Sequence, residues 1–324
     1  MRERRGAARS ARRRILRGLA PAGVLLVAGC QGASSGACTV QWHSTLPVLM
    51  RHAMAVVPAR VNGETVGLGV DSGAQTTAVT PELVATLDLR PDPGMSARRL
   101  AGLGGNAYSQ VVALDSLQLG GVVYRKIDVF AASLGALGRG DLAVSGLIGE
   151  DLLSRYDVGL DIGHREISLY TVRGCATVSP PWGTATPIPI RLSEHNHLVF
   201  PVELDGRRLT AMLDTGAGSD VLLERGANAL HLTPDLLAHD STVAGQGIGE
   251  RAVDVRTHRF ATLQVGQEAI QGPAIGVSDA SDSDIDLILG MGFLRGRQVF
   301  VSHATAQMFV RSDTGAGRLA EGHE

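Results

Sequence analysis

The chain contains two copies of one turn motif, in which an apolar run ends in Asp and is followed by a hydroxyl residue, Gly and Ala. The first copy is Asp71-Ser72-Gly73-Ala74, and the second copy, 143 residues later, is Asp214-Thr215-Gly216-Ala217. This pattern predicts a strand that delivers a carboxylate at a tight turn. Two such strands favour folds in which a pair of carboxylates can face each other.

The similarity between the two halves of the chain extends beyond these turns. Each Asp is preceded by a dipeptide that favours a two-residue hairpin turn, Asn62-Gly63 in one half and Asp205-Gly206 in the other. Each half closes with an apolar pair before Gly, at Ile148-Gly149 and Leu289-Gly290. A Gly-rich turn begins 31 residues after each Asp and comprises Gly102, Gly104 and Gly105, or Gly245, Gly247 and Gly249. Such a repeat predicts two duplicated lobes.

Composition and length fit two strand-rich lobes. The chain has 324 residues and is 44% hydrophobic but only 4% aromatic, with 41 Gly and 13 Pro, which is typical of a turn-rich β protein. Thr80-Pro81 predicts the start of one short helix, with Thr80 as its cap. We expect an export signal at 1–29, a tether at 30–51, an N-terminal lobe at 52–173, a Pro-rich interlobe linker at 174–196, a C-terminal lobe at 197–311 and a flexible tail at 312–324.

Residues 1–29 resemble a bacterial export signal, because eight Arg precede a short apolar run at 18–28. The run ends at Val27-Ala28-Gly29-Cys30, which resembles a lipoprotein box with Cys30 as the lipidated residue, and residues 12–17 also resemble a twin-arginine signal. The alternative is a basic amphipathic helix retained in a cytosolic protein. We expect a periplasm-facing lipoprotein of the cell envelope, and Gln31 favours the outer membrane.

The remainder of the chain is acidic. Residues 1–29 hold eight of the 30 Lys and Arg but one of the 32 Asp and Glu, so the net charge without them is about −9. Nucleic acid is therefore not an expected partner, since phosphate binding needs a basic face. Cys38 and Cys175 are expected to form a disulfide in an exported protein, with two separate buried thiols as the alternative.

Three other motifs point less clearly to chemistry. His195-Asn196-His197 has no third ligand at metal spacing, and the acidic residues of 279–286 lack the Gly and Glu of a calcium loop. The glycines of 245–249 lack the helix that opens behind a nucleotide-binding loop. We therefore expect no metal and no cofactor.

The paired Asp turns, the Gly-rich turns and the apolar-Gly segments together resemble the aspartic peptidases, and within them the retropepsin-like group. The resemblance covers most of residues 52–310. It implies an all-β fold of two duplicated retropepsin- or pepsin-like lobes with the active site at their interface. Retropepsins assemble this site from two chains, whereas here both lobes lie on one chain, so a monomer would suffice.

The resemblance also implies an activity. Asp71 and Asp214 would share one proton, so that the ionised carboxylate activates a water and the protonated one donates to a peptide carbonyl. Ser72 and Thr215 would hydrogen-bond across to the opposite lobe, and Gly73 and Gly216 would let the backbone approach the carboxylates.

The Gly-rich turns would then be flaps that close over a peptide or protein substrate, or else plain hairpin turns. The alternatives to an aspartic endopeptidase are a non-catalytic peptide-binding or sensing lipoprotein that keeps this fold, and a purely structural envelope lipoprotein.

Overall fold

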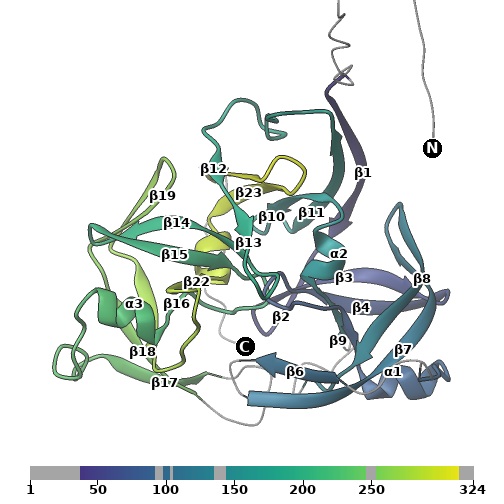
Figure 1. Cartoon of the computed structure of the whole chain (residues 1–324), viewed down its shortest axis with the longest axis horizontal. Helices are drawn as coiled ribbons and strands as arrows, with labels where there is room; N and C mark the ends of the chain where they lie inside the picture. The colour runs from purple at the N-terminus through teal and green to yellow at the C-terminus, as the bar shows by residue number, and fades with distance from the viewer. Residues whose placement is uncertain (1–36, 92–97, 103–104, 135–143, 246–252, 314–324) are drawn as a thin grey trace, which may run out of the picture. The chain divides into compact units, whose positions relative to one another are not determined.

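The computed structural model describes residues 37–91, 98–102, 105–134, 144–245 and 253–313, and strands dominate it (Figure 1). The strands form three sheets. The four helices among the described residues are short: α1 (Pro81–Thr86), α2 (Glu150–Leu153), α3 (Glu224–Ala229) and α4 (Met291–Leu294). The all-β fold is therefore observed, and none of the described helices is long and apolar enough to cross a membrane.

The N-terminal lobe is built on a sheet with the strand order β2-β3-β4-β9-β5-β8-β7-β6. Its strands are β2 (Leu49–Arg51), β3 (Met54–Val61), β4 (Glu64–Val70), β5 (Ala78–Val79), β6 (Arg98–Gly102), β7 (Gly105–Leu119), β8 (Val122–Ala131) and β9 (Val144–Ile148). Helix α1 begins as predicted, since Pro81 is its first residue and the hydroxyl of Thr80 accepts a hydrogen bond from the Leu83 amide.

The C-terminal lobe repeats this arrangement, with the strand order β17-β18-β21-β16-β22-β15-β14-β19-β20 and β13 paired to β14. Its strands are β13 (Arg191–Leu192), β14 (Leu198–Leu204), β15 (Arg207–Leu213), β16 (Val221–Leu222), β17 (Ser241–Gly245), β18 (Val253–Arg259), β19 (Thr262–Val265), β20 (Glu268–Gln271), β21 (Ala274–Ser278) and β22 (Leu287–Leu289). In each lobe the strand that ends at an Asp pairs in parallel with the closing apolar strand, β4 with β9 and β15 with β22.

The two predicted hairpin turns are confirmed. Asn62-Gly63 and Asp205-Gly206 connect β3 to β4 and β14 to β15, and both residues of each dipeptide have positive φ. This backbone matches the twist of the flanking strands and suits Asn-Gly and Asp-Gly. In each turn the first side chain accepts a backbone N–H from a neighbouring segment, Ser116 for Asn62 and Thr262 for Asp205.

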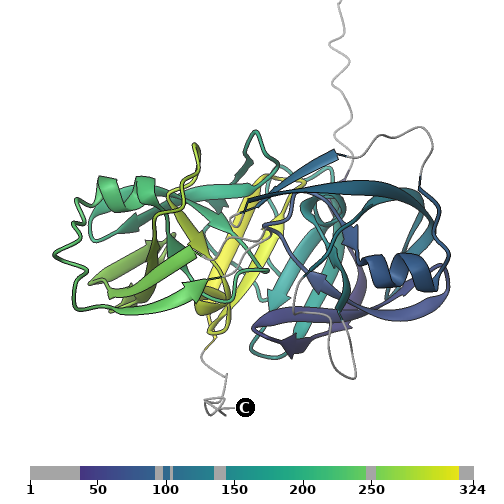
Figure 2. The same cartoon turned by 90° about the horizontal axis from the view of Figure 1, so that it is seen from below.

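The third sheet is shared by the two halves of the chain. Its order is β1-β11-β10-β23-β24-β12, and its strands are β1 (Thr39–Pro47), β10 (Asp157–Asp161), β11 (Glu166–Arg173), β12 (Ile188–Pro189), β23 (Arg297–Ser302) and β24 (Gln307–Ser312). Antiparallel pairing of β10 with β23 joins the halves, and Figure 2 shows the yellow β23–β24 hairpin within this layer. The predicted division into two lobes did not include this sheet.

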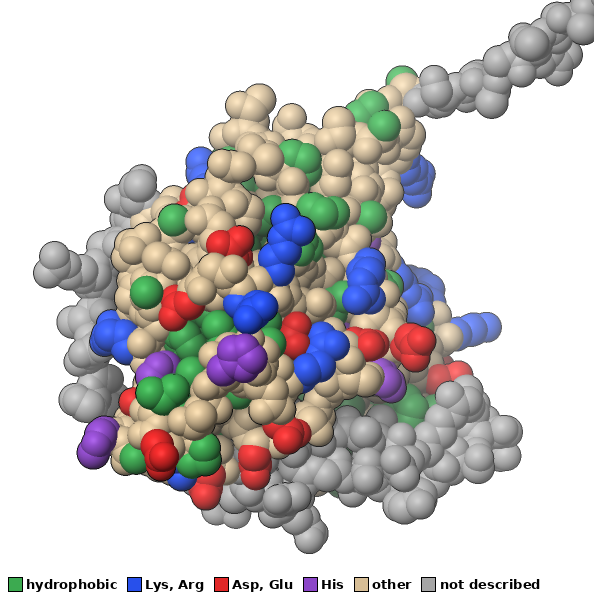
Figure 3. All heavy atoms as spheres, turned by 60° about the vertical axis from the view of Figure 1, so that its left-hand side comes forward, with side chains coloured by type: hydrophobic (Ala, Val, Ile, Leu, Met, Phe, Trp, Pro, Cys, Tyr) green, Lys and Arg blue, Asp and Glu red, His purple; other side chains and the backbone are tan. Residues whose placement is uncertain are grey.

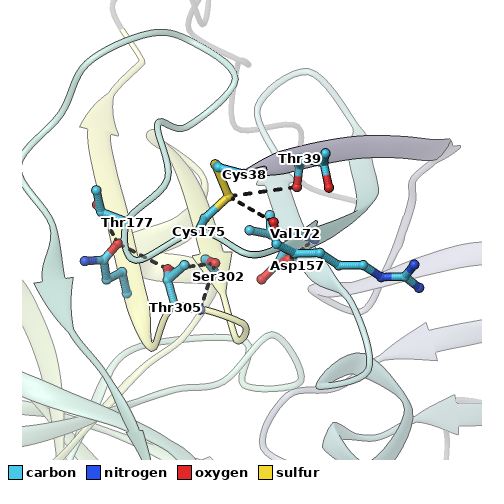
Figure 4. Close-up of a disulfide and its surroundings, with 10 residues drawn as sticks. Cys38, Thr39, Asp157, Val172, Cys175, Thr177, Ser302 and Thr305 are labelled. Atoms are coloured by element: carbon cyan, nitrogen blue, oxygen red, sulfur yellow. Dashed lines mark hydrogen bonds between the residues drawn. A yellow bond between two sulfur atoms is a disulfide. The ribbon is translucent and has the colours of Figure 1, made fainter. Parts of the chain in front are cut away.

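The predicted tether is wrong from Thr39 onward, because residues 39–47 form β1 and pair with β11. Apolar residues alternate along this strand and end in buried Leu46. The small polar residues that precede the strand made this alternation easy to overlook. A disulfide between Cys38 and Cys175, with Cα atoms 4.5 Å apart, fixes the start of β1 to the end of β11 (Figure 4). Residues 1–36, including Cys30, lie outside the described residues.

The predicted linker also contains ordered strands. Ile188–Pro189 forms β12 at the edge of the shared sheet, and Arg191–Leu192 forms β13. An edge strand tolerates Pro, because the side of the strand that faces away from the sheet makes no ladder hydrogen bond, so no bond is lost where Pro lacks an N–H. The predicted tail starts within β24, which ends at Ser312, and residues 314–324 lie outside the described part of the chain.

Candidate active site

The two Asp turns lie at the ends of β4 and β15, each held against the closing segment of its own lobe. The Asp71 amide donates to the carbonyl of Ile148 at 3.0 Å, and the Asp214 amide donates to Leu289 at 2.9 Å. The glycine that follows each apolar residue allows this close packing. A Cβ on Gly149 would lie 2.5 Å from the backbone of Thr76, and one on Gly290 would lie 2.5 Å from the Ala217 carbonyl oxygen.

Each carboxylate is first positioned by its own turn. One oxygen of Asp71 accepts the amides of Gly73 and Ala74, both at 3.0 Å. One oxygen of Asp214 accepts the amides of Gly216 at 2.8 Å and Ala217 at 3.1 Å. The two carboxyl groups lie close enough for each to influence the ionisation of the other. The geometry thus brings together two acids that lie 143 residues apart in the sequence.

The glycines of the two turns explain how the carboxyl groups come so close. A Cβ on Gly73 would lie 2.4 Å from the carboxyl carbon of Asp214. A Cβ on Gly216 would lie 2.4 Å from a carboxyl oxygen of Asp71. Each carboxyl group therefore occupies the space that a side chain on the opposite turn would need.

Ser72 and Thr215 connect the two turns through four buried hydrogen bonds. The amide of each residue donates to the hydroxyl of the other, at 3.0 and 3.1 Å. The Ser72 hydroxyl donates to the Leu213 carbonyl at 2.8 Å, and the Thr215 hydroxyl donates to the Val70 carbonyl at 2.7 Å. Because every donor bonds to the opposite lobe, these residues fix the position of one Asp relative to the other.

The environment favours one shared proton. Burial, and then the charge of Asp214, raise the pKa of Asp71 well above its ordinary value. Burial also raises the pKa of Asp214, but the amides of Gly216 and Ala217 and its contact with Asp71 oppose this rise. The two acids therefore titrate as one coupled pair that can share a single proton.

A family model described as aspartyl protease matches residues 57–152 and 200–293, which is more than half of the chain. The chain belongs to the aspartyl protease family. A search of the curated proteins found no match. Among solved structures, the chain is similar to the crystal structure of basic 7S globulin from soybean, with 11% identity over 85% of this chain and 96% of that one and a TM-score of 0.49.

Each aspartyl protease lobe carries a hairpin at its Gly-rich turn. Strands β6 and β7 pair from Arg98 to Gly102, and Gly102 lies opposite Gly105. Strands β17 and β18 pair up to Gly245, which lies opposite Val253. In Figure 1 both hairpins extend from their lobes toward each other. Gly104, Gly247 and Gly249 lie outside the described residues.

One acid that supports the second Asp turn was not predicted from the sequence. Six residues after each Asp, the first lobe has Thr77, whose hydroxyl accepts the Gly149 amide and contacts Asp151. The second lobe has buried Asp220 there, which accepts the amides of Gly290 and Phe293 at 2.8 and 3.0 Å.

The position equivalent to Asp151 is Gly292 in the second lobe, where a Cβ would lie 2.7 Å from the Asp220 carboxylate. The acid thus lies at Asp151 in the first lobe and at Asp220 in the second. The sequence signal for this difference is that Thr77 and Asp220 each lie six residues after the Asp of their own lobe.

The carboxyl of Asp220 predicts a pH-dependent stability of the second lobe. Burial raises its pKa to about 6 from 3.8, against the two amides. The folded state binds this proton more tightly than the unfolded state. The contribution of protonated Asp220 to the free energy of unfolding is therefore fully present below the ordinary Asp pKa and is lost as the pH rises through about 6. Urea unfolding of wild type at pH 4 and pH 7.5 should show this loss, which is about 1–3 kcal/mol. Asp220→Asn should reduce the difference, and an unchanged difference would show that Asp220 titrates normally.

One group of possible metal ligands occurs among the described residues, on the shared sheet and not at the Asp pair. Ligand atoms of Asp161, His164 and Asp313 lie within 4.8 Å of one another. His164 already hydrogen-bonds to Asp161 at 2.9 Å, and this contact and both acidic charges raise its pKa. The acids thus favour a protonated imidazole, which does not bind metal.

Proposed function

We propose that this aspartyl protease family member is an active endopeptidase that hydrolyses peptide bonds with a water activated by Asp71 and Asp214. The observation that supports the proposal best is the close approach of each carboxyl group to the opposite turn, held by four hydrogen bonds between the turns. A single chain supplies both halves of the pair, so a monomer can complete the site.

The proposed reaction follows from the protonation state of the pair. The ionised carboxylate of the pair takes a proton from a water, whose oxygen attacks the carbonyl carbon of the scissile peptide, and the protonated partner donates its proton to the carbonyl oxygen. The tetrahedral intermediate collapses when the first carboxyl gives its proton to the amine, the C–N bond breaks, and the second carboxylate takes a proton back from a hydroxyl of the intermediate. No covalent bond to the protein forms in either step.

The proposed substrate is an extended segment of a peptide or protein. Hairpins such as β6–β7 and β17–β18 can donate backbone hydrogen bonds to an extended chain, which is a general mode of peptide recognition. Figure 3 shows acidic and basic side chains interspersed on one face of the second lobe. Nucleic acid is not part of the proposal, because the chain beyond residue 29 is acidic.

The proposal is tested with the full chain, purified in detergent and incubated with an unfolded protein substrate between pH 3 and 7. Asp71→Asn and Asp214→Asn should each lower the cleavage rate by at least about 1000-fold, because each removes one of the two proton-transfer groups. Asp115→Asn, on an exposed part of β7, is the matched control and should retain activity. Cleavage retained in Asp214→Asn would refute the proposal, and peptide binding without cleavage by wild type would favour the non-catalytic alternative.

We also propose that the protein is exported and attached to the cell envelope by a lipid on Cys30, facing the periplasm. The sequence around Cys30 supports this, and the Cys38–Cys175 disulfide fits an oxidising compartment. Cys30→Ser should move the protein from the membrane fraction to the soluble fraction, and an unchanged membrane fraction would argue against the lipid anchor.

A further inference from the structure

His197 and Asp214 lie at the same end of the β14–β15 pair, and an apolar residue takes the corresponding position in the first lobe. The antiparallel pair Val199 and Met212 lies at this end, and His197 and Asp214 each lie two residues beyond it. In the first lobe Val56 pairs with Gly69, and Met54 and Asp71 each lie two residues beyond that pair. The two Asp turns are alike, but their neighbours on the preceding strand are not.

Asp214 is one of three acids whose charges act on His197. The imidazole interacts electrostatically with Asp282 of the β21–β22 loop, then with Asp214, and also with His195 and Asp284. Met54, by contrast, is buried in an apolar cluster with Val56, Val144 and Leu147. The electrostatic field of His197 therefore acts on the dyad from the side of Asp214, and the equivalent residue of the first lobe carries no charge.

His197 is held in place through its backbone while its ring remains available. Its amide donates to the Ser193 hydroxyl at 3.1 Å, and its carbonyl accepts the Ser193 amide at 2.8 Å. The ring is half-buried, and its Nδ1 atom is buried without a hydrogen-bond partner among the described residues. No described contact of the fold thus requires this imidazole nitrogen.

We propose that His197 is a positioning residue for the dyad, whose positive charge keeps Asp214 ionised and leaves the shared proton on Asp71. This inference rests on the proposed peptidase reaction, to which it adds the assignment of base and acid. Two nearly identical Asp turns need an asymmetric neighbour to distinguish them, and His197 supplies a charge on one side only.

The charge on His197 has a consequence for the acidic side of the pH profile. Burial lowers the pKa of His197, and the charges of Asp282, Asp214 and Asp284 oppose that shift. Once protonated, the imidazolium opposes the protonation of Asp214, so the singly ionised dyad persists to a lower pH.

The first test measures kcat/KM against pH for the full chain and for His197→Met, which copies the residue of the first lobe. The acid limb should move upward by about half a pH unit or more in this variant, since the positive charge is lost. His195→Gln is the matched control, because its ring lies 6.3 Å from that of His197 in the same loop, and it should leave the limb unmoved. An unmoved limb in His197→Met would overturn the proposal.

The second test needs no cleavage and therefore separates this inference from the proposed function. The His197 imidazole is titrated by NMR in the full chain, with its signal identified by its loss in His197→Met. Asp214→Asn should lower the His197 pKa by about half a unit, and Asp71→Asn should change it much less. An unchanged pKa in Asp214→Asn, or equal shifts in both variants, would overturn the proposal even if the protein cleaves peptides.

Discussion

Gly216→Ala is expected to lower the rate of peptide cleavage by at least about 1000-fold while most of the fold is retained. Displaced carboxyl groups would no longer be positioned to transfer protons to and from the water and the substrate. The new Cβ would lie 2.4 Å from a carboxyl oxygen of Asp71, a distance that requires the carboxyl group or the turn to move. Gly73→Ala should behave alike, since its Cβ would lie 2.4 Å from the carboxyl carbon of Asp214. Cleavage assays, with circular dichroism to follow folding, measure the effect.

The control for these variants is Gly296→Ala, since a Cβ on Gly296 would contact nothing within 4 Å. It should retain wild-type activity. Gly216→Ala with near-normal cleavage would mean that the carboxyl groups do not need the close approach seen between the turns.

The second large effect is expected from Glu150→Ala, which should lower the free energy of unfolding by about 3–5 kcal/mol. Glu150 of α2 is 1% exposed and bonds to His303 of the β23–β24 turn at 2.7 Å, and the other nitrogen of His303 contacts the Tyr156 carbonyl. Without Glu150 the buried imidazole keeps only the Tyr156 carbonyl and loses its acidic partner, so a link between the two halves of the chain is lost.

Urea unfolding at pH 6 measures this cost, with Glu64→Ala as the control because Glu64 is exposed on β4. A cost for Glu150→Ala no greater than that for Glu64→Ala would show that the buried pair does not stabilise the joined halves.

The parts of the fold that could be predicted from the sequence are those with local causes. Asn62-Gly63 and Asp205-Gly206 favour a particular backbone, and Thr80-Pro81 favours a helix start, so their structures follow from neighbouring residues alone. The Asp turns were found through their repetition, which no single turn would have shown to be a pair.

The parts that were missed depend on contacts between distant segments. Strand β1 is ordered by pairing with β11 more than 100 residues later, and β10 pairs with β23 of the other half. The roles of Asp220 and His197 likewise depend on which distant segments the fold brings next to the second Asp turn. Sequence periodicity does not show which strands become neighbours.

The most direct test of the shared proton is the titration of the Asp71 carboxyl by carbon NMR, in wild type and in Asp214→Asn. Burial and the charge of Asp214 both raise the pKa of Asp71, so wild type should titrate well above the ordinary value. Removing the charge of Asp214 should lower the Asp71 pKa measurably, although burial keeps it raised. The same pKa in both proteins, close to that of an ordinary Asp, would contradict the coupling of the two lobes through one proton.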